Sequence, residues 1–147
     1  MVTGLLSPER VTLDCDVMIV KPPEALAVLE SAADRVGREL GLPSRWFNAD
    51  VQIRRDLLPA GWRTRRVAVA AYHAIRFHAA SRIDLIAMKI VAGRDQDIED
   101  LQAMGVDRHD ASFLRSHFVR LEESGTPPAV VRNARLLLEA LLGEGPR

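Results

Sequence analysis

The hydrophobic pattern of this chain changes its period near residue 82. Before that point, residues 11–20 and 66–71 form short apolar runs that are typical of β-strands. After it, apolar residues recur at helical spacing, in segments that Gly93, Gly105 and the sequence SGTPP interrupt. Strands early in a chain and helices late are typical of an α+β fold, and we therefore predict that class.

Four helices are predicted in the later part of the chain, near residues 82–92, 95–104, 110–124 and 128–142. Asp110 is a suitable N-cap for the third of them. Pro127 and Pro128 suit the first turn of the fourth, where the missing N–H of proline would have no partner in any case.

In the earlier part, one amphipathic helix separates the predicted strands. The sequence EALAVLESAADRVGREL has the helical pattern, and Gly41 is placed to end it. Short strands are predicted at residues 51–53 and 66–71, while residues 72–78 fit a strand or a loop equally well. A length of 147 residues suits a single domain, which we divide into a strand-rich core (1–81) and a helical part (82–147).

The charge balance excludes a strong electrostatic field of one sign around the whole protein. Twenty Lys and Arg residues against twenty Asp and Glu give a net charge of zero, so a nucleic acid would have to meet a local basic patch. Cys15 is the single cysteine, which excludes a disulfide within the chain. We find neither a leader segment nor an apolar run of membrane-spanning length, so we expect a cytoplasmic protein without a membrane partner.

Two carboxylates interrupt the first apolar run, RVTLDCDVMIV. Side chains at positions i and i+2 of a strand point the same way, so Asp14 and Asp16 share one face. Neighbouring carboxylates repel each other, and water, arginines or a divalent cation could compensate them. Such a pair suits a hard cation such as Mg²⁺, which prefers oxygen ligands. Two acids on the solvent face of an antiparallel strand are an equally good interpretation.

A second charged cluster lies in MKIVAGRDQDIEDL, at the break between two predicted helices. Lys89 and Arg94 flank Gly93, and the acids Asp97 and Asp100 lie further along the chain, three residues apart, on neighbouring parts of one helical face. The pattern alone favours a salt-bridged solvent face over a functional site.

The third feature is basic, with Trp62 among five arginines: Arg54, Arg55, Arg63, Arg65 and Arg66. These side chains could hold RNA or a triphosphate by charge and stacking. A solvated loop and strand edge is the more favoured interpretation. The four histidines show no metal-ligand spacing, and we assign them no role.

The first two motifs together resemble a known family. RVTLDCDVMIV resembles the R-x-T-x-D-x-D strand of nucleotidyltransferase-like proteins related to the AbiEii toxins of type IV toxin–antitoxin systems. MKIVAGRDQDIEDL resembles the downstream signature of that family, a lysine, then alanine and arginine, then aspartates followed by leucine. RELGLPSRWFNADV between them is also similar, so the likeness runs from Arg10 to Met104.

This resemblance implies a polymerase-β-like nucleotidyltransferase fold, with a mixed β-sheet flanked by helices. It also implies that Asp14 and Asp16 are catalytic metal ligands, which hold Mg²⁺ or Mn²⁺ against a nucleoside triphosphate. Lys89 would face the triphosphate as a catalytic and nucleotide-binding residue. Asp97 would complete that side of the pocket as a catalytic residue, with Arg94 as a further nucleotide-binding group.

The function expected from this resemblance is metal-dependent transfer of a nucleotide to an RNA or protein acceptor. The protein would be a toxin-like component, and its partners would include an antitoxin. In this superfamily a Gly-Gly or Gly-Ser turn usually precedes the aspartate strand, but Gly4 is the only glycine before Asp14. The alternative is therefore a catalytically degenerate domain that binds a nucleotide, RNA or protein. A plain structural domain with solvated aspartates is a third interpretation.

Overall fold

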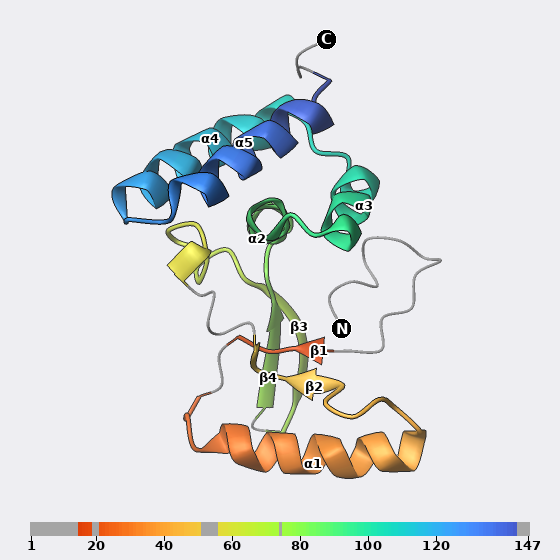
Figure 1. The fold of residues 1–147 in the computed structure, drawn as a ribbon. Coiled ribbons are helices and arrows are strands. Elements are labelled where there is room, and N and C mark those ends of the chain that lie inside the picture. The colour runs from red at the N-terminus through yellow and green to blue at the C-terminus, as the bar shows by residue number, and fades with distance from the viewer. Residues whose placement is uncertain (1–14, 19–20, 51–55, 74, 144–147) are drawn as a thin grey trace. The chain divides into compact units, whose positions relative to one another are not determined.

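The computed structural model describes residues 15–18, 21–50, 56–73 and 75–143. Its elements, shown in Figure 1, are β1 (Cys15–Asp16), α1 (Ala25–Leu40), β2 (Phe47–Asn48), β3 (Val67–Tyr72), β4 (Ile75–Ala79), α2 (Arg82–Ala92), α3 (Asp95–Met104), α4 (Arg108–Glu123) and α5 (Pro128–Leu141). The predicted α+β class is confirmed. The chain forms two compact units, Met1–Asp56 and Leu57–Arg147, which we describe separately.

In the first unit, a short parallel strand pair accompanies helix α1. β1 pairs with β2, and Asp16 lies opposite Asn48 in the register. The N–H of Cys15 donates to the carbonyl of Trp46, and the N–H of Val17 donates to the carbonyl of Asn48 at 2.8 Å. Only residues 15–16 of the strand predicted at 11–20 are described as strand, and residues 11–14, 19–20 and 51–53 lie outside the described residues.

A glycine and a tryptophan join α1 to the segment before β2. The indole Nε1 of Trp46 donates to the carbonyl oxygen of Ala33 at 2.9 Å, which brings the ring across the helix. A Cβ at Gly37 would lie 2.6 Å from that nitrogen, so the close approach requires glycine. Gly41 ends the helix in the left-handed conformation, with φ of 66°, as its sequence predicts.

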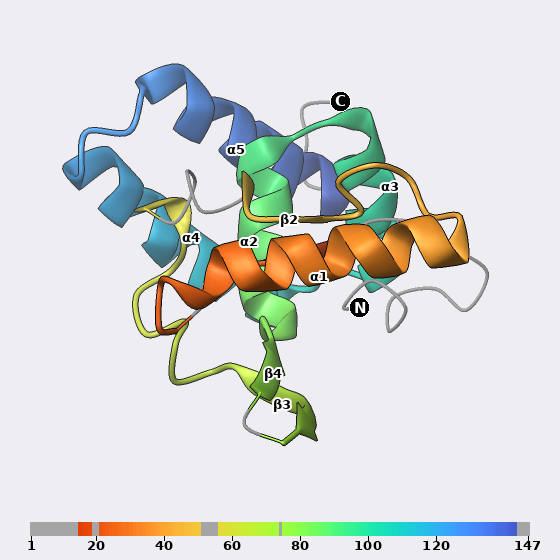
Figure 2. The ribbon, with the colours of Figure 1, turned by 90° about the horizontal axis from the view of Figure 1, so that it is seen from below.

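The second unit begins with a loop and a β-hairpin. β3 and β4 pair antiparallel, with an irregularity between Ala68 and Ala70. Most residues of 72–78, for which the sequence pattern fits a strand or a loop, thus belong to strands, and His73 adopts a positive φ of 51° after β3. Figure 2 shows β4 leading into α2.

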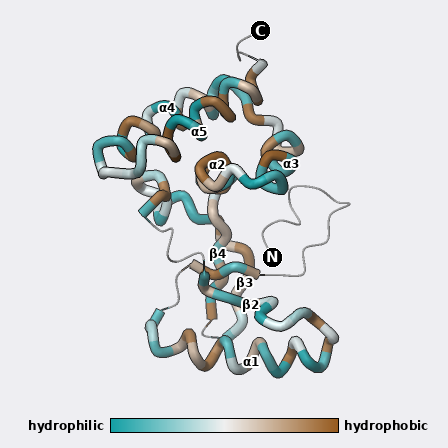
Figure 3. The backbone as a smooth tube through the Cα atoms, in the orientation of Figure 1, coloured by the Kyte–Doolittle hydropathy of each residue, from teal (hydrophilic) through white to brown (hydrophobic). Residues whose placement is uncertain are grey.

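Helix α2 is the centre of the helical core. It contacts α3 and α5, and α4 contacts α5, as Figure 1 shows. Ile86 and Ile90 of α2 are almost completely buried, as are Leu101 of α3 and Phe118 of α4. In Figure 3, α2 is strongly hydrophobic and the link to α3 is hydrophilic. The largest apolar side chains thus pack between helices, and the two-stranded hairpin contributes little to this core.

The helix bounds match the predictions closely, with one correction. α2 and α3 have the predicted bounds, whereas α4 begins two residues before the predicted start. Its N-cap is Asp107 rather than Asp110. The Asp107 side chain accepts the N–H of Asp110 at 2.9 Å, and the Asp110 carboxylate accepts the N–H of Asp107 at 3.1 Å. Asp110 is therefore the third residue of helix α4 and forms a capping box with Asp107.

Among the described residues, no helix combines the length and the apolar character that a membrane span requires.

Candidate functional site

The first predicted motif is partly described. Asp16 is exposed at the end of β1, on the same side of the strand pair as its register partner Asn48. The amide oxygen of Asn48 accepts the N–H of Asp50 at 3.0 Å. Cys15 is half-buried. Asp14 lies outside the described residues, and within those that are described no three His, Cys, Asp or Glu residues are grouped to hold a metal.

The second predicted motif forms one ion-pair network between α2 and α3. Lys89 is in the last turn of α2, and Gly93 ends that helix with a φ of 60°. The N–H of Gly93 donates to the carbonyl oxygen of Lys89 at 2.8 Å. This tight turn directs α3 so that its two acids reach the lysine: Nζ of Lys89 lies 3.3 Å from Oδ1 of Asp97 and 2.5 Å from Oδ2 of Asp100.

Asp97 is the most buried member of this network. Its side chain is 1% exposed and accepts Nε and Nη2 of Arg94 at 2.7 and 3.1 Å, and the backbone N–H of Arg94 at 3.3 Å. Burial by itself raises the pKa of Asp97. The hydrogen bonds and charge of Arg94, together with the charge of Lys89, outweigh burial and hold the pKa of Asp97 below its usual value of 3.8.

The network thus contains two cations and two anions in contact. Lys89 and Asp100 are largely buried, with 15% and 11% of their side chains exposed, whereas 75% of the Arg94 side chain is exposed. The groups are ion-paired, as the salt-bridge interpretation expects, but Lys89, Asp97 and Asp100 are largely buried and Arg94 is the exposed member. An incoming anion would have to exchange with a carboxylate to reach Lys89. The catalytic and nucleotide-binding roles of these residues stay a prediction.

Sequence reasoning missed a second buried ion pair, which involves one of the arginines of the basic cluster. Nη2 and Nε of Arg65 lie 2.6 and 3.1 Å from the two oxygens of Asp84, which is fully buried. Oγ of Ser81 adds a third contact to this carboxylate at 2.5 Å. The guanidinium also lies 5.2 Å from the ring centre of Phe113. Arg65 is therefore a structural side chain that fixes the loop before the hairpin.

The remaining arginines of that cluster are less constrained or not described. Arg63 lies over the ring of Trp62 at 5.4 Å, and Nε of Arg66 donates to the carbonyl oxygen of Arg63 at 2.8 Å. Arg54 and Arg55 lie outside the described residues.

The sequence SRID, residues 81–84, carries a signal from which the role of Asp84 could have been predicted, because a serine three residues before an acid marks a helix start.

His117, to which the sequence assigned no role, is buried in α4. Its Nε2–H donates to the carbonyl oxygen of Leu57 at 2.9 Å, which fixes the tautomer. Its Nδ1 is buried without a hydrogen-bond partner among the described residues. Burial lowers the pKa of His117 below its usual value of 6.5, and the charge of Arg120 acts in the same direction, against the hydrogen bond to Leu57. His117 is therefore a neutral, structural residue at neutral pH.

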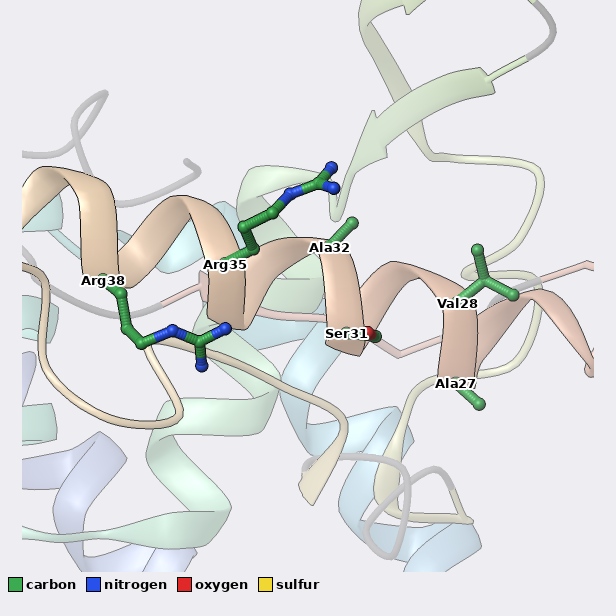
Figure 4. A pocket seen from close by; sticks show the side chains of 6 residues that line it. All are labelled: Ala27, Val28, Ser31, Ala32, Arg35 and Arg38. Atoms are coloured by element: carbon green, nitrogen blue, oxygen red, sulfur yellow. The ribbon is translucent and has the colours of Figure 1, made fainter.

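A shallow groove on α1 is a further surface feature of the described residues. All six side chains that line it come from this one helix: Ala27, Val28, Ser31, Ala32, Arg35 and Arg38, as Figure 4 shows. The groove contains no residue of either predicted motif, and we assign it no ligand.

Comparison with known proteins shows the class of this protein. A family model for nucleotidyltransferases matches residues 6–124, a range that contains both motifs, so the chain is nucleotidyltransferase-like. The chain belongs to this family, which is described as "Nucleotidyltransferase of unknown function (DUF6036)". Neither the curated proteins nor the solved structures gave a match.

Proposed function

We propose that this protein transfers a nucleotide from a nucleoside triphosphate to an RNA or protein acceptor in the cytoplasm, with Mg²⁺ or Mn²⁺ as cofactor. The observation that supports this proposal is the family match over residues 6–124, which contains the Asp14/Asp16 pair and the Lys89 network. Nucleotidyl transfer depends mainly on positioning and on charge neutralisation, so a few charged side chains suffice for it.

Asp14 and Asp16 would hold the cation. The described part of this motif fits such a role, because Asp16 is exposed and lies opposite Asn48, and carboxylate and amide oxygens are hard donors. When bound, a divalent cation offsets the charge of the triphosphate and of the departing phosphates.

Lys89 would face the triphosphate. Asp97, held by Arg94, would orient the lysine, and Arg94 carries its positive charge at the surface, where a phosphate can meet it. We extend the proposal to a toxin-like role related to the AbiEii toxins, with an antitoxin as partner, on the basis of the sequence resemblance.

The test measures transfer of label from α-labelled nucleoside triphosphates to cellular RNA and to protein, with Mg²⁺ and with a chelator. The variant Asp14→Asn with Asp16→Asn should abolish labelling and leave the fold intact, since it removes two mutually repelling charges. Asp34→Asn is the matched control, because Asp34 is an exposed acid on α1. Labelling that persists in the double variant, or that is absent with all four nucleotides, would contradict the proposal.

A second candidate function is a degenerate domain that binds a nucleotide, RNA or protein without transfer. The ion pairing of Lys89 favours it, because a lysine already compensated by Asp97 and Asp100 has little net charge to offer a phosphate. Calorimetry that shows nucleotide binding without any labelling would support this candidate.

A further inference from the structure

We propose that the β3–β4 hairpin is a docking surface for single-stranded RNA, on which bases stack against Tyr72 and Phe77 while nearby arginines meet the phosphates. The choice of RNA over another polyanion rests on the proposed function, whose acceptor is RNA or protein. The hairpin contains no residue of the Asp14/Asp16 motif or of the Lys89 motif, so RNA binding can be tested apart from nucleotide transfer.

The hairpin exposes a large amount of apolar surface. Figure 1 and Figure 2 show that it extends from the start of α2, away from α4 and α5. Ala79, at the base of β4, is its only buried residue among those described. Five large apolar side chains of its strands are exposed, by 41% to 66%: Val67, Val69, Tyr72, Ile75 and Phe77. Apolar surface concentrated in this way is typical of an interaction site.

Two aromatic rings are held together on one face of the hairpin. In the antiparallel register, Tyr72 lies opposite Ile75 and Ala70 lies opposite Phe77. Ile75 and Phe77 are two residues apart on β4, so all four side chains share a face. The rings of Tyr72 and Phe77 meet edge to face, with their centroids 6.2 Å apart. Each ring restricts the other while both stay exposed, so they can offer aromatic faces on which RNA bases stack.

The segment that contains the hairpin is basic throughout. Residues 57–83 include five arginines and no acidic residue. Arg65 and Arg82 are ion-paired with carboxylates of α2 and α4. The other three are exposed and form no ion pair among the described residues: Arg63, Arg66 and Arg76. Because the net charge of the chain is zero, a nucleic acid needs a local basic patch, and this segment supplies one.

The edge of β4 brings the two features together. Arg76 precedes Phe77 on β4, and neighbouring side chains of a strand point to opposite faces. Among the described residues, β4 pairs with β3 alone, so its other edge is open. An RNA strand along this edge can place bases over the aromatic face and phosphates within reach of Arg76. A second copy of the chain fits this surface less well, because it would bring arginines against arginines.

The experiment measures binding of a fluorescein-labelled oligouridylate to the full chain by fluorescence anisotropy, with a chelator present. The ring-less variant combines Tyr72→Leu with Phe77→Leu, which removes both rings and keeps an apolar surface. It should weaken binding roughly tenfold or more, because stacking on two bases is lost. Tyr72→Phe keeps the ring and should bind as the wild type does.

A salt titration tests the phosphate contacts. Three arginines on phosphates predict that the logarithm of the binding constant falls against the logarithm of the salt concentration with a slope of about −2. Arg76→Gln should reduce the magnitude of this slope by about 0.7. Arg132→Gln is the matched control, because Arg132 is an exposed arginine on α5 of the same unit, and it should leave the slope unchanged. Circular dichroism of each variant confirms folding.

The outcomes separate this inference from the proposed function. No binding at low salt, equal binding by the ring-less variant, or tighter binding of duplex RNA or of single-stranded DNA would overturn it. A wild type that is dimeric by light scattering, beside a monomeric ring-less variant, would also overturn it, because a second copy would then cover the hairpin. If RNA is labelled in the transfer assay while the ring-less variant binds RNA as the wild type does, the proposed function stands and this inference falls. Ring-dependent RNA binding without any labelling gives the reverse.

Discussion

Replacement of Arg65 should be the most damaging single change on the loop before the hairpin. Arg65→Ala leaves the carboxylate of Asp84 fully buried, with Ser81 as its one remaining side-chain donor among the described residues. It also removes the hydrogen bond from Nη1 of Arg65 to the carbonyl oxygen of Ala60, which is 2.9 Å long, and the stacking on Phe113.

The loss of stability that Arg65→Ala causes depends on how deeply the Arg65–Asp84 ion pair is buried. Removing one partner of a buried ion pair typically destabilises a protein by about 3–5 kcal/mol. Because 29% of the Arg65 side chain is exposed, while that of Asp84 is 1% exposed, we expect the lower end of this range, about 3 kcal/mol. With a denaturation slope of about 2 kcal/mol per molar urea, the midpoint should fall by about 1.5 M.

The assay is urea denaturation followed by circular dichroism at the helical minimum. Arg63→Ala is the matched control, because Arg63 is exposed and its side chain lies over the ring of Trp62 without an ion pair among the described residues. It should cost less than about 1 kcal/mol. Removing both charges with Arg65→Met and Asp84→Leu should cost less than Arg65→Ala. Equal midpoints for Arg65→Ala and Arg63→Ala would refute the importance of this pair.

Two further predictions concern α1 and α4. Gly37→Ala should destabilise the first unit by about 1–3 kcal/mol, because the new Cβ would lie 2.6 Å from Nε1 of the Trp46 ring. Tryptophan fluorescence during urea denaturation should show this loss of stability, and an unchanged midpoint would contradict the prediction. The lowered pKa of His117 means that the unfolded chain takes up its proton at a higher pH than the folded one. The contribution of His117 to stability should therefore be complete above about pH 6.5 and decrease as the pH falls below that value. His117→Gln should remove this part of the pH dependence of the urea midpoint. The same dependence of the midpoint on pH in the wild type and the variant would contradict the prediction.

The helices were predictable where their ends are set by nearby residues. Gly93 and Gly105 end α2 and α3 in the left-handed conformation, and glycine is the usual residue there. The start of α4 was misplaced because two aspartates three residues apart both suit a helix N-terminus, and Asp107 takes the cap. The hairpin was ambiguous because its turn uses His73 at a positive φ, where the sequence offers no glycine.

In the candidate site, too, contacts between residues near in sequence were predictable and contacts between distant residues were not. Lys89 and its two acids lie within one short stretch, so helical spacing was enough to group them. The Arg65–Asp84 pair spans 19 residues and the His117–Leu57 contact spans 60, and such contacts depend on tertiary packing that a periodic pattern does not specify. For the Asp14/Asp16 pair, strand alternation predicts a shared face, and this stays a prediction because Asp14 lies outside the described residues.

The short link between α2 and α3 restricts how the length of this chain can change. Gly93 and Arg94 are the only residues between Ala92 and Asp95. Each residue added to a helix rotates the residues after it by about 100°, so one insertion early in α3 would turn Asp97 and Asp100 away from Lys89. Insertions and deletions should therefore be poorly tolerated in this link, because the spacing between the lysine and the two acids is part of the network itself.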